Sequence, residues 1–231
     1  SFFNMKFIFP SFFTILNLVS GFVGVLFLLD KNYDLIEYCI YLSLIFDFLD
    51  GFIARKLNAT SKFGKHLDSF ADLISFGLLP SLILYDWFSI NSSIDIYKYF
   101  SILILLFASL RLSKFNIDNK QEFVFLGVPT PLVALFFNSL IYNSGTYNNF
   151  LTPESLLLLV IFFSIMMVVN IRFISLKFKD FSIFENIHKY ILLFTSLFLI
   201  LFIKFDAFPI IVIIYILVSL FYFFFNRNKV N

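Results

Sequence analysis

The sequence predicts an all-α protein, a polytopic membrane bundle of about eight transmembrane helices. Of its 231 residues, 60% are hydrophobic and only 14% are charged, and the mean hydropathy is +0.93. A soluble domain of this size has too little interior to bury so much apolar surface. Eight apolar stretches support the helix count, and most of them approach the roughly 20 residues that a helix needs to span a bilayer.

The eight expected helices lie in one membrane domain that covers residues 1–231. A threonine that can cap a helix, Thr152, precedes Pro153 at a first helical position, which predicts the start of the sixth helix. The fifth and seventh helices are short for a span. The expected limits are roughly Phe9–Leu29, Leu35–Arg55, Leu67–Phe88, Tyr97–Phe115, Pro129–Tyr142, Pro153–Ile174, Tyr190–Ile203 and Ala207–Phe225.

The basic residues predict the orientation in the membrane. If the N-terminus and every second loop lie on one side, that side holds all 17 Lys and Arg residues except Lys31, Lys98 and Lys204. The positive-inside rule then places both termini in the cytoplasm. We expect a multi-pass protein of the cytoplasmic membrane of a prokaryote. The first apolar stretch lacks a small-residue cleavage site, so we expect it to be a span rather than a signal peptide.

Four carboxylates interrupt the apolar pattern, and they predict a functional site. An ionisable residue at membrane depth costs about 2.5–3.5 kcal/mol on insertion scales. Asp47 and Asp50 share one helix face, and Asp68 and Asp72 share a face of the next helix. Two adjacent antiparallel helices could therefore point all four at one another. Like charges that close favour a bound cation, and oxygen ligands suit divalent ions such as Mg²⁺ or Mn²⁺.

The residues around the acids suggest phosphoryl chemistry on a lipid. Gly51, Ala54 and Gly64 leave room for a ligand near the backbone, and Arg55 offers a bidentate fork suited to phosphate. Asp47 precedes Arg55 by about 12 Å of helix at 1.5 Å per residue, which is the depth of a lipid headgroup. Two alternatives remain open: a solvated loop in which the acids pair with nearby Lys and Arg, and a carboxylate-lined ion pathway of a metal-binding transporter.

The acids and their neighbours form the pattern D-x2-D-G-x2-A-R-x8-G-x3-D-x3-D, which resembles the signature of the CDP-alcohol phosphatidyltransferase family at every fixed position. The resemblance implies a homodimeric membrane enzyme with two divalent ions, Mg²⁺ or Mn²⁺. It implies that Asp72 is also the general base. By the same resemblance, the metal ligands would be Asp47, Asp50, Asp68 and Asp72, and the CDP-binding residues Thr14, Asn17, Gly51, Ala54, Arg55 and Gly64.

Segments flanking the signature are similar to the phosphatidylserine synthase branch of that family. They are Pro10–Asn17, Ser75–Gly77, Leu110–Asn116 and Gly127–Pro131. Two residues depart from the usual pattern, because Ser11 replaces an Asn and Lys114 replaces an Arg. The family core would cover about residues 9–174, and the extra helices at about 190–225 carry no motif.

This branch implies transfer of a phosphatidyl group from CDP-diacylglycerol, or its archaeal ether analogue CDP-archaeol, to L-serine. The carboxylate of serine requires a cation. Each basic candidate could instead be a positive-inside anchor, and Thr130 could instead cap a helix. The candidate serine-binding residues are Arg111, Lys114, Thr130, Arg172 and Lys177.

Rival functions also remain at this stage. The same fold could use glycerol 3-phosphate, inositol phosphate or a second lipid as acceptor, because the chain has enough Lys and Arg to bind a phosphorylated one. A metal-binding transporter is the rival from another functional class. We expect the membrane lipid to be a partner and expect no nucleic acid.

Overall fold

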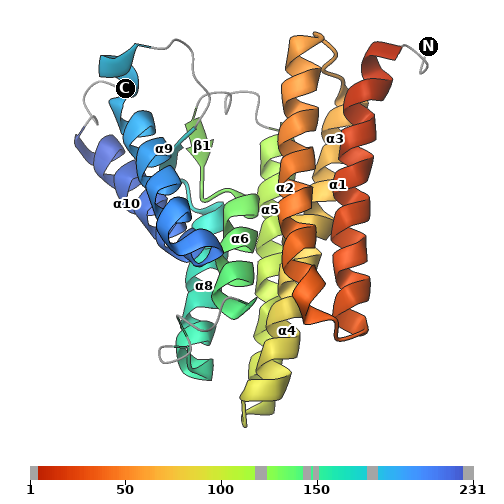
Figure 1. Ribbon diagram of the computed structural model, residues 1–231, viewed down its shortest axis with the longest axis vertical. Helices are drawn as coiled ribbons and strands as arrows, with labels where there is room; N and C mark the ends of the chain where they lie inside the picture. Colours follow the sequence, from red (N-terminus) through yellow and green to blue (C-terminus); the bar gives the residue numbers. More distant parts are fainter. Residues whose placement is uncertain (1–4, 118–123, 143–146, 148–150, 176–181, 226–231) are drawn as a thin grey trace.

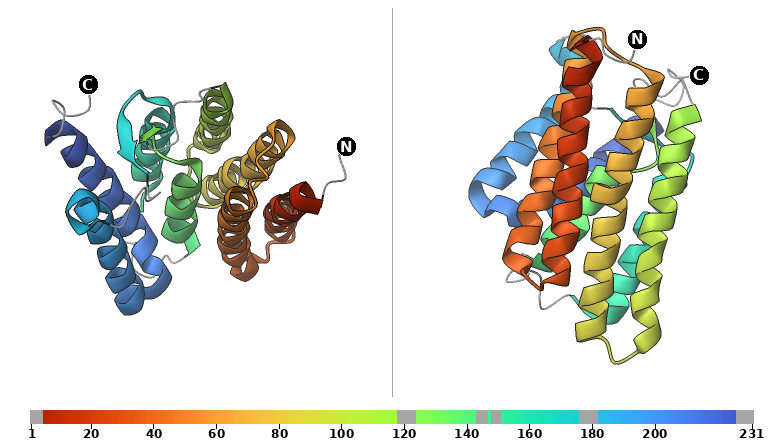
Figure 2. Two further views of the ribbon diagram at one scale, coloured as in Figure 1. Left: turned by 90° about the horizontal axis from the view of Figure 1, so that it is seen from above. Right: turned by 90° about the vertical axis from the view of Figure 1, so that its right-hand side faces the viewer.

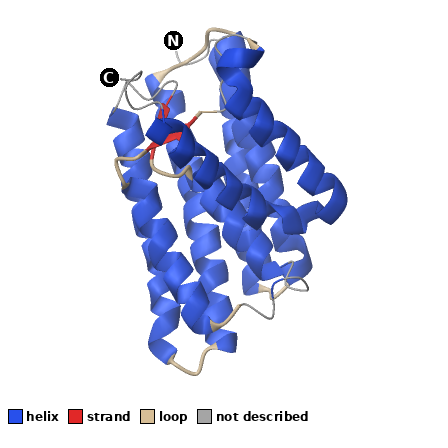
Figure 3. Ribbon diagram, turned by 90° about the vertical axis from the view of Figure 1, so that its left-hand side faces the viewer, coloured by secondary structure: helices blue, strands red, loops and turns tan. Residues whose placement is uncertain are grey.

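The computed structural model describes residues 5–117, 124–142, 147, 151–175 and 182–225. Within these residues most of the chain is helical, and the strands form one short two-stranded ribbon (Figure 3). The predicted all-α bundle is therefore confirmed, with the ribbon as one small addition.

Long helices packed side by side form the N-terminal half of the bundle (Figure 1). The helix α1 packs along α2, and α3 continues without a break through a π-helical turn, η1, into α4. These elements are α1 (Met5–Leu29), α2 (Tyr33–Lys56), α3 (Lys62–Asp72), η1 (Leu73–Leu78), α4 (Leu79–Asn91), the 3-10 turn η2 (Asp95–Ser101) and α5 (Ile102–Ile117).

The C-terminal half adds shorter helices and a helical hairpin. The hairpin of α9 and α10 lies on the side of the molecule opposite α1 (Figure 2). These elements are β1 (Val124–Leu126), α6 (Thr130–Tyr142), α8 (Pro153–Val168), β2 (Arg172–Ile174), α9 (Ile183–Ile203), the 3-10 turn η3 (Lys204–Asp206) and α10 (Ala207–Phe225).

The start of α8 confirms the predicted cap, and its end corrects a prediction. Thr152 accepts a hydrogen bond from the backbone N–H of Ser155, and the side chain of Ser155 completes a capping box. The expected helix over Pro153–Ile174 is wrong at its far end, because α8 stops at Val168. The last part of that apolar run, Arg172–Ile174, is the strand β2 instead. It pairs antiparallel with β1, so pairing with a distant segment outweighs local helix propensity there.

Close helix contacts fix the position of α1 against η1. A Cβ atom on Gly21 would lie 2.7 Å from the Cα of Ser75, nearer than real Cβ atoms approach a backbone. Only glycine therefore allows the two backbones to come this close. The side chain of Ser75 uses the proximity and donates a hydrogen bond to the carbonyl of Asn17 at 2.9 Å. This contact locks α1 beside the turn that follows Asp72.

Several of the helices are suited to a membrane. Four stretches of the described chain are long and apolar enough to cross one, and the last contains both α9 and α10. The helices α6 and α8 are apolar but shorter. Each of the eight expected spans overlaps a helix, while the number that cross the bilayer stays a prediction. The four stretches are Ile8–Leu29, Lys62–Asn91, Asp95–Ile117 and Asn186–Phe225.

One end of the bundle gathers several features of interest. The start of α1 and the end of α10 lie toward the same end of the molecule, which is uppermost in Figure 1. The connection between α2 and α3 and the β1–β2 ribbon lie toward that end as well. Residues from both halves of the chain can therefore meet there.

Candidate active site

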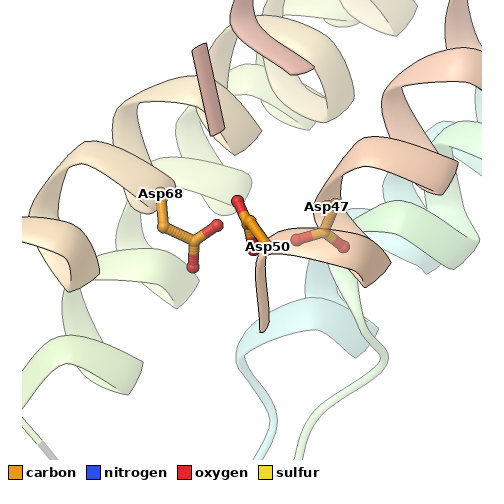
Figure 4. Close-up of side chains that lie close together, drawn as sticks. All are labelled: Asp47, Asp50 and Asp68. Atoms are coloured by element: carbon orange, nitrogen blue, oxygen red, sulfur yellow. The ribbon is translucent and has the colours of Figure 1, made fainter. Parts of the chain in front are cut away.

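Three of the four predicted carboxylates converge. Asp47 and Asp50 project from α2 and Asp68 projects from α3, so that the side chains face one another across the two helices (Figure 4). One carboxylate oxygen from each lies within 4.8 Å of the others. The helical spacing in the sequence predicted this meeting, because residues three apart on α2 share a face.

The convergent acids fit a hard divalent cation. Oδ2 of Asp50 and Oδ1 of Asp68 are buried and have no hydrogen-bond partner among the described residues. No described lysine or arginine forms a salt bridge with the three carboxylates, and Lys65 instead donates to the carbonyl of Asn116 at 3.0 Å. Buried carboxylate oxygens without partners are costly unless a cation binds them. The loop-pairing alternative therefore has no salt bridge to support it among the described residues, where Arg55 acts on Asp47 and Asp50 only through a longer-range electrostatic attraction.

The fourth acid, Asp72, is held separately. It is buried one turn beyond Asp68 on α3, and Oδ1 accepts a hydrogen bond of 3.1 Å from Nδ2 of Asn17. It is not one of the three acids whose oxygens cluster, so its role as a metal ligand stays a prediction. The π-helical turn η1 follows it directly, and such turns occur often at functional sites.

Asn17 joins three elements around Asp72. Its amide holds Asp72, and its backbone carbonyl accepts hydrogen bonds from Ser43 of α2 at 3.3 Å and from Ser75 of η1 at 2.9 Å. Its own Oδ1 is buried with no partner among the described residues. The sequence predicted Asn17 as a CDP contact; the structure gives it a positioning contact that the sequence did not show. The free Oδ1 leaves an acceptor for a ligand.

Arg55 and Gly51 lie together near the end of α2. A Cβ atom on Gly51 would lie 3.3 Å from Nη1 of Arg55, so the guanidinium folds back over the glycine. Ala54 is half-buried on the same helix turn, and Arg55 is exposed. This arrangement leaves a cation above a bare stretch of backbone, next to the acidic cluster, which suits a phosphate group.

Gly64 and Thr14, the other predicted CDP contacts, have local partners. The N–H of Gly64 donates to the side chain of Ser61, the N-cap of α3, at 2.9 Å. A Cβ atom at Gly64 would crowd that oxygen at 3.1 Å. Thr14 is buried and donates to the carbonyl of Pro10 at 3.2 Å. These contacts place both residues without testing whether they bind CDP.

Two of the predicted serine-binding residues do meet. Arg111 of α5 is only 8% exposed, and Nη1 donates to the hydroxyl of Thr130, the first residue of α6, at 3.1 Å. Nε of Arg111 is buried and has no partner among the described residues. Arg111 also interacts electrostatically with Asp72. A buried cation with a free donor, within electrostatic range of Asp72, is suited to an anionic group.

The other predicted serine-binding residues do not join the Arg111–Thr130 pair in the described contacts. Lys114 is exposed and donates to Oδ1 of Asn170 at 2.8 Å and to the carbonyl of Val168 at 3.3 Å, which caps the end of α8. Arg172 is exposed in β2 opposite Leu126. Lys177 lies outside the described residues. Of this set, the structure therefore joins only Arg111 and Thr130 by a hydrogen bond that involves both side chains.

Sequence reasoning missed two contacts near the site. Asn116 of α5 donates to Ser69 of α3 at 2.8 Å and ties the two helices together. Tyr215 of α10 donates to the carbonyl of Ile174 at 2.8 Å. Asn116 stands in a quoted segment, so its position offered a signal. Tyr215 stands in an apolar helix without a motif, so nothing in the sequence marked it.

Comparison with known proteins identifies the family of the chain. The sequence model of the CDP-alcohol phosphatidyltransferase family matches residues 7–168, which include every residue of the acidic cluster. The chain is 33% identical over 179 residues to a protein of Helicobacter pylori named CDP-diacylglycerol–serine O-phosphatidyltransferase, covering 75% of both chains.

Two further relatives come from distant organisms. A Bacillus subtilis protein with the same name is 37% identical over 174 residues, which cover 73% of this chain and 90% of that protein. An archaetidylserine synthase of Methanothermobacter thermautotrophicus is 32% identical over 170 residues, which cover 71% and 68% of the two chains.

We predict that the three-carboxylate cluster binds Mn²⁺. Asp50→Asn and Asp68→Asn should each weaken Mn²⁺ binding at least tenfold, because each removes a charge and one oxygen ligand. The measurement is the free Mn²⁺ signal in electron paramagnetic resonance, with detergent-purified protein first treated with a chelator. Asp34→Asn, an exposed acid in the first turn of α2, is the matched control and should bind as the wild type does. Equal binding by all variants would contradict the site.

Proposed function

Because the chain belongs to the CDP-alcohol phosphatidyltransferase family, we propose that it transfers the phosphatidyl group of CDP-diacylglycerol to L-serine, giving phosphatidylserine and CMP. The convergence of Asp47, Asp50 and Asp68 carries the proposal, because it supplies the charge that a metal–diphosphate site requires. Relatives named for transfer to serine support the choice of acceptor. The archaeal relative keeps CDP-archaeol open as the lipid donor.

A divalent-metal site is part of this proposal. Asp47, Asp50 and Asp68, together with Asp72, would hold Mg²⁺ or Mn²⁺, and four carboxylates suffice for two ions. Bound there, the ions would offset the negative charge of the diphosphate and of the departing CMP. The unpartnered buried oxygens of Asp50 and Asp68 support this assignment.

The donor side of the site would bind the CDP moiety. Arg55 would pair with a phosphate, and Gly51 leaves the backbone beside it open. The nucleotide would be lined by Thr14 of α1, Ala54 of α2 and Gly64 of α3. Asn17 would offer its unpartnered Oδ1 to an amino or hydroxyl group of the nucleotide while its amide holds Asp72.

Asp72 would act as the general base. In the reaction, the serine hydroxyl oxygen forms a bond to the phosphorus that carries the lipid, and the bond from that phosphorus to CMP breaks. The hydroxyl proton passes to Asp72. The hydrogen bond from Asn17 occupies Oδ1 of Asp72 and leaves Oδ2 to accept that proton.

The acceptor side would be formed by Arg111 and Thr130. The free Nε of Arg111 would pair with the serine carboxylate, and the electrostatic interaction of Arg111 with Asp72 is consistent with a serine hydroxyl held near its base. Lys114 and Arg172 would add positive charge on the acceptor side, and Lys177, outside the described residues, stays a candidate from the sequence. An anchoring role at the membrane surface remains the alternative for these three.

The proposal includes location and assembly. The protein would lie in the cytoplasmic membrane, with its termini and active site on the cytoplasmic side, because the positive-inside rule assigns the loops rich in Lys and Arg to the cytoplasm. The ends of α1 and α10 at one end of the bundle support this orientation. We propose a homodimer on the family resemblance, and a single domain whose core covers about residues 9–174.

The purified protein is expected to release CMP from CDP-diacylglycerol only when serine and Mg²⁺ or Mn²⁺ are present. The measurement offers serine, glycerol 3-phosphate and inositol phosphate separately in detergent. Release only with a phosphorylated acceptor would keep the family and reject serine. If a folded, metal-loaded sample released no CMP with any acceptor, the hypothesis of a metal-binding transporter would replace this proposal.

Asp72→Asn should lower kcat by about 10²–10⁴, the usual contribution of a general base. The substituted amide keeps an oxygen that can accept from Asn17, so the local hydrogen bond should survive. Binding of CDP-diacylglycerol, measured by equilibrium titration, should change less than threefold. Turnover close to wild type would reject Asp72 as the base.

Arg111→Met should raise the KM for serine about tenfold or more, because it removes a buried cation while keeping an unbranched chain of similar length. The KM for CDP-diacylglycerol should change much less. Steady-state CMP release with each substrate varied in turn distinguishes the two. An unchanged serine KM, or an equal rise in both constants, would contradict the assignment.

A further inference from the structure

The C-terminal helix α10 holds the ribbon strand β2 by two hydroxyl groups. The hydroxyl of Tyr215 donates to the carbonyl of Ile174 at 2.8 Å, and the backbone N–H of Ile174 donates to the hydroxyl of Ser219 at 3.3 Å. The three residues are at most 5% exposed. The ring of Tyr215 also stacks on Phe173, with centroids 6.1 Å apart.

These contacts satisfy a strand edge that would otherwise be unpaired. In an antiparallel ladder, the N–H and C=O of one residue point to the same side. Both backbone groups of Ile174 point to α10. The direction alternates along the strand, so residues at odd positions face β1. The bond from the N–H of Gly127 to the carbonyl of Ile171 agrees with this. A buried edge without partners is strongly disfavoured. The hairpin therefore completes the ribbon in place of a third strand.

The ribbon leads directly to the acceptor side. Gly127 follows β1 with φ of +75°, and Val128 then donates to the carbonyl of Met166 at 2.9 Å. Two residues later Thr130 opens α6 and accepts the hydrogen bond from Arg111. A Cβ atom on Gly127 would lie 2.2 Å from the carbonyl oxygen of Met167, so this turn has little freedom of its own. The bond from Gly127 to Ile171 couples this turn, and the start of α6 after it, to the ribbon.

We propose that Tyr215 is a positioning residue of the acceptor subsite, and that the C-terminal hairpin is a working part of that subsite rather than an added membrane anchor. By fixing Ile174, Tyr215 fixes the ribbon and with it the Thr130 hydroxyl that orients Arg111. The inference rests on the proposed function, because it assigns the Arg111–Thr130 pair to the acceptor. Tyr215 acts through these groups and is not itself catalytic.

The packing of α10 against β2 supports the argument. Tyr215 and Ser219 lie 41 and 45 residues beyond Ile174 in the chain, and both bond to its backbone. A helix that served only as a membrane anchor would not need two buried hydroxyl groups bonded to the backbone N–H and C=O of one residue.

Tyr215→Phe tests the proposal, because it removes the hydroxyl and keeps the ring stacked on Phe173. We expect the KM for serine to rise about tenfold, the effect of one buried carbonyl left without its donor. The KM for CDP-diacylglycerol should stay within twofold of wild type. Tyr222→Phe is the matched control, since Tyr222 lies further along α10 with its ring against His188, and its serine KM should not change.

A second variant and a double substitution guard against indirect effects. Ser219→Ala leaves the other backbone group of Ile174 without its acceptor and should raise the serine KM in the same way, even if Tyr215→Phe does not fold. With Thr130→Val, the combined rise should be smaller than the product of the two single effects, because both act through one arrangement.

The outcomes separate this inference from the function on which it rests. Wild-type protein that releases no CMP with serine would reject the proposed function before any variant is measured. Active wild type with an unchanged serine KM in Tyr215→Phe and Ser219→Ala would reject the positioning role alone. A parallel rise in both substrate constants, or fully multiplicative effects with Thr130→Val, would reject it too, since a purely structural defect predicts those results.

Discussion

Repulsion among buried carboxylates is the constraint on which the rest of the structure depends. Two unit charges 4 Å apart interact by about 4 kcal/mol at an effective dielectric constant of 20, and three acids here share a space of that size. The apolar surroundings raise the free-energy cost of these charges further. Such acids stay together only where a cation or a proton offsets the charge, and only in a fold rigid enough to hold Asp47, Asp50 and Asp68 in place.

The first helix supplies much of that rigidity. Gly21 lets α1 approach η1 at backbone distance, and Asn17 then bonds to α2, to η1 and to Asp72. Asn17 thus fixes the positions of α1, α2 and α3 along one another. The hydrogen bond between Asn116 and Ser69 fixes α3 against α5. The acids come from two helices, but their geometry depends on four.

The helices and the acidic cluster could be predicted from sequence because both depend on local spacing. Apolar length marked the helices, and intervals of three and four residues placed the acids on common faces. The ribbon could not be predicted, because Arg172–Ile174 continues an apolar run and becomes a strand only through Val124–Leu126, far away in the chain. The role of Tyr215 was hidden for the same reason: its partner is a backbone carbonyl, which leaves no pattern of side chains. The Asn17–Asp72 contact joins segments 55 residues apart and was equally invisible.

The proposed site has two halves that would divide the chemistry between them. Helices α2 and α3 carry the acids and the cation suited to a diphosphate, whereas Arg111 of α5, buried and bonded to Thr130 of α6, is suited to a carboxylate. Asp72 lies where the halves meet, bonded to Asn17 on one side and in the field of Arg111 on the other. A group transfer needs both substrates at one base, so the precision of the reaction depends on how the halves are held together. The contacts of α10 to β2 are part of that junction, which gives the C-terminal hairpin a reason to be specific in its packing.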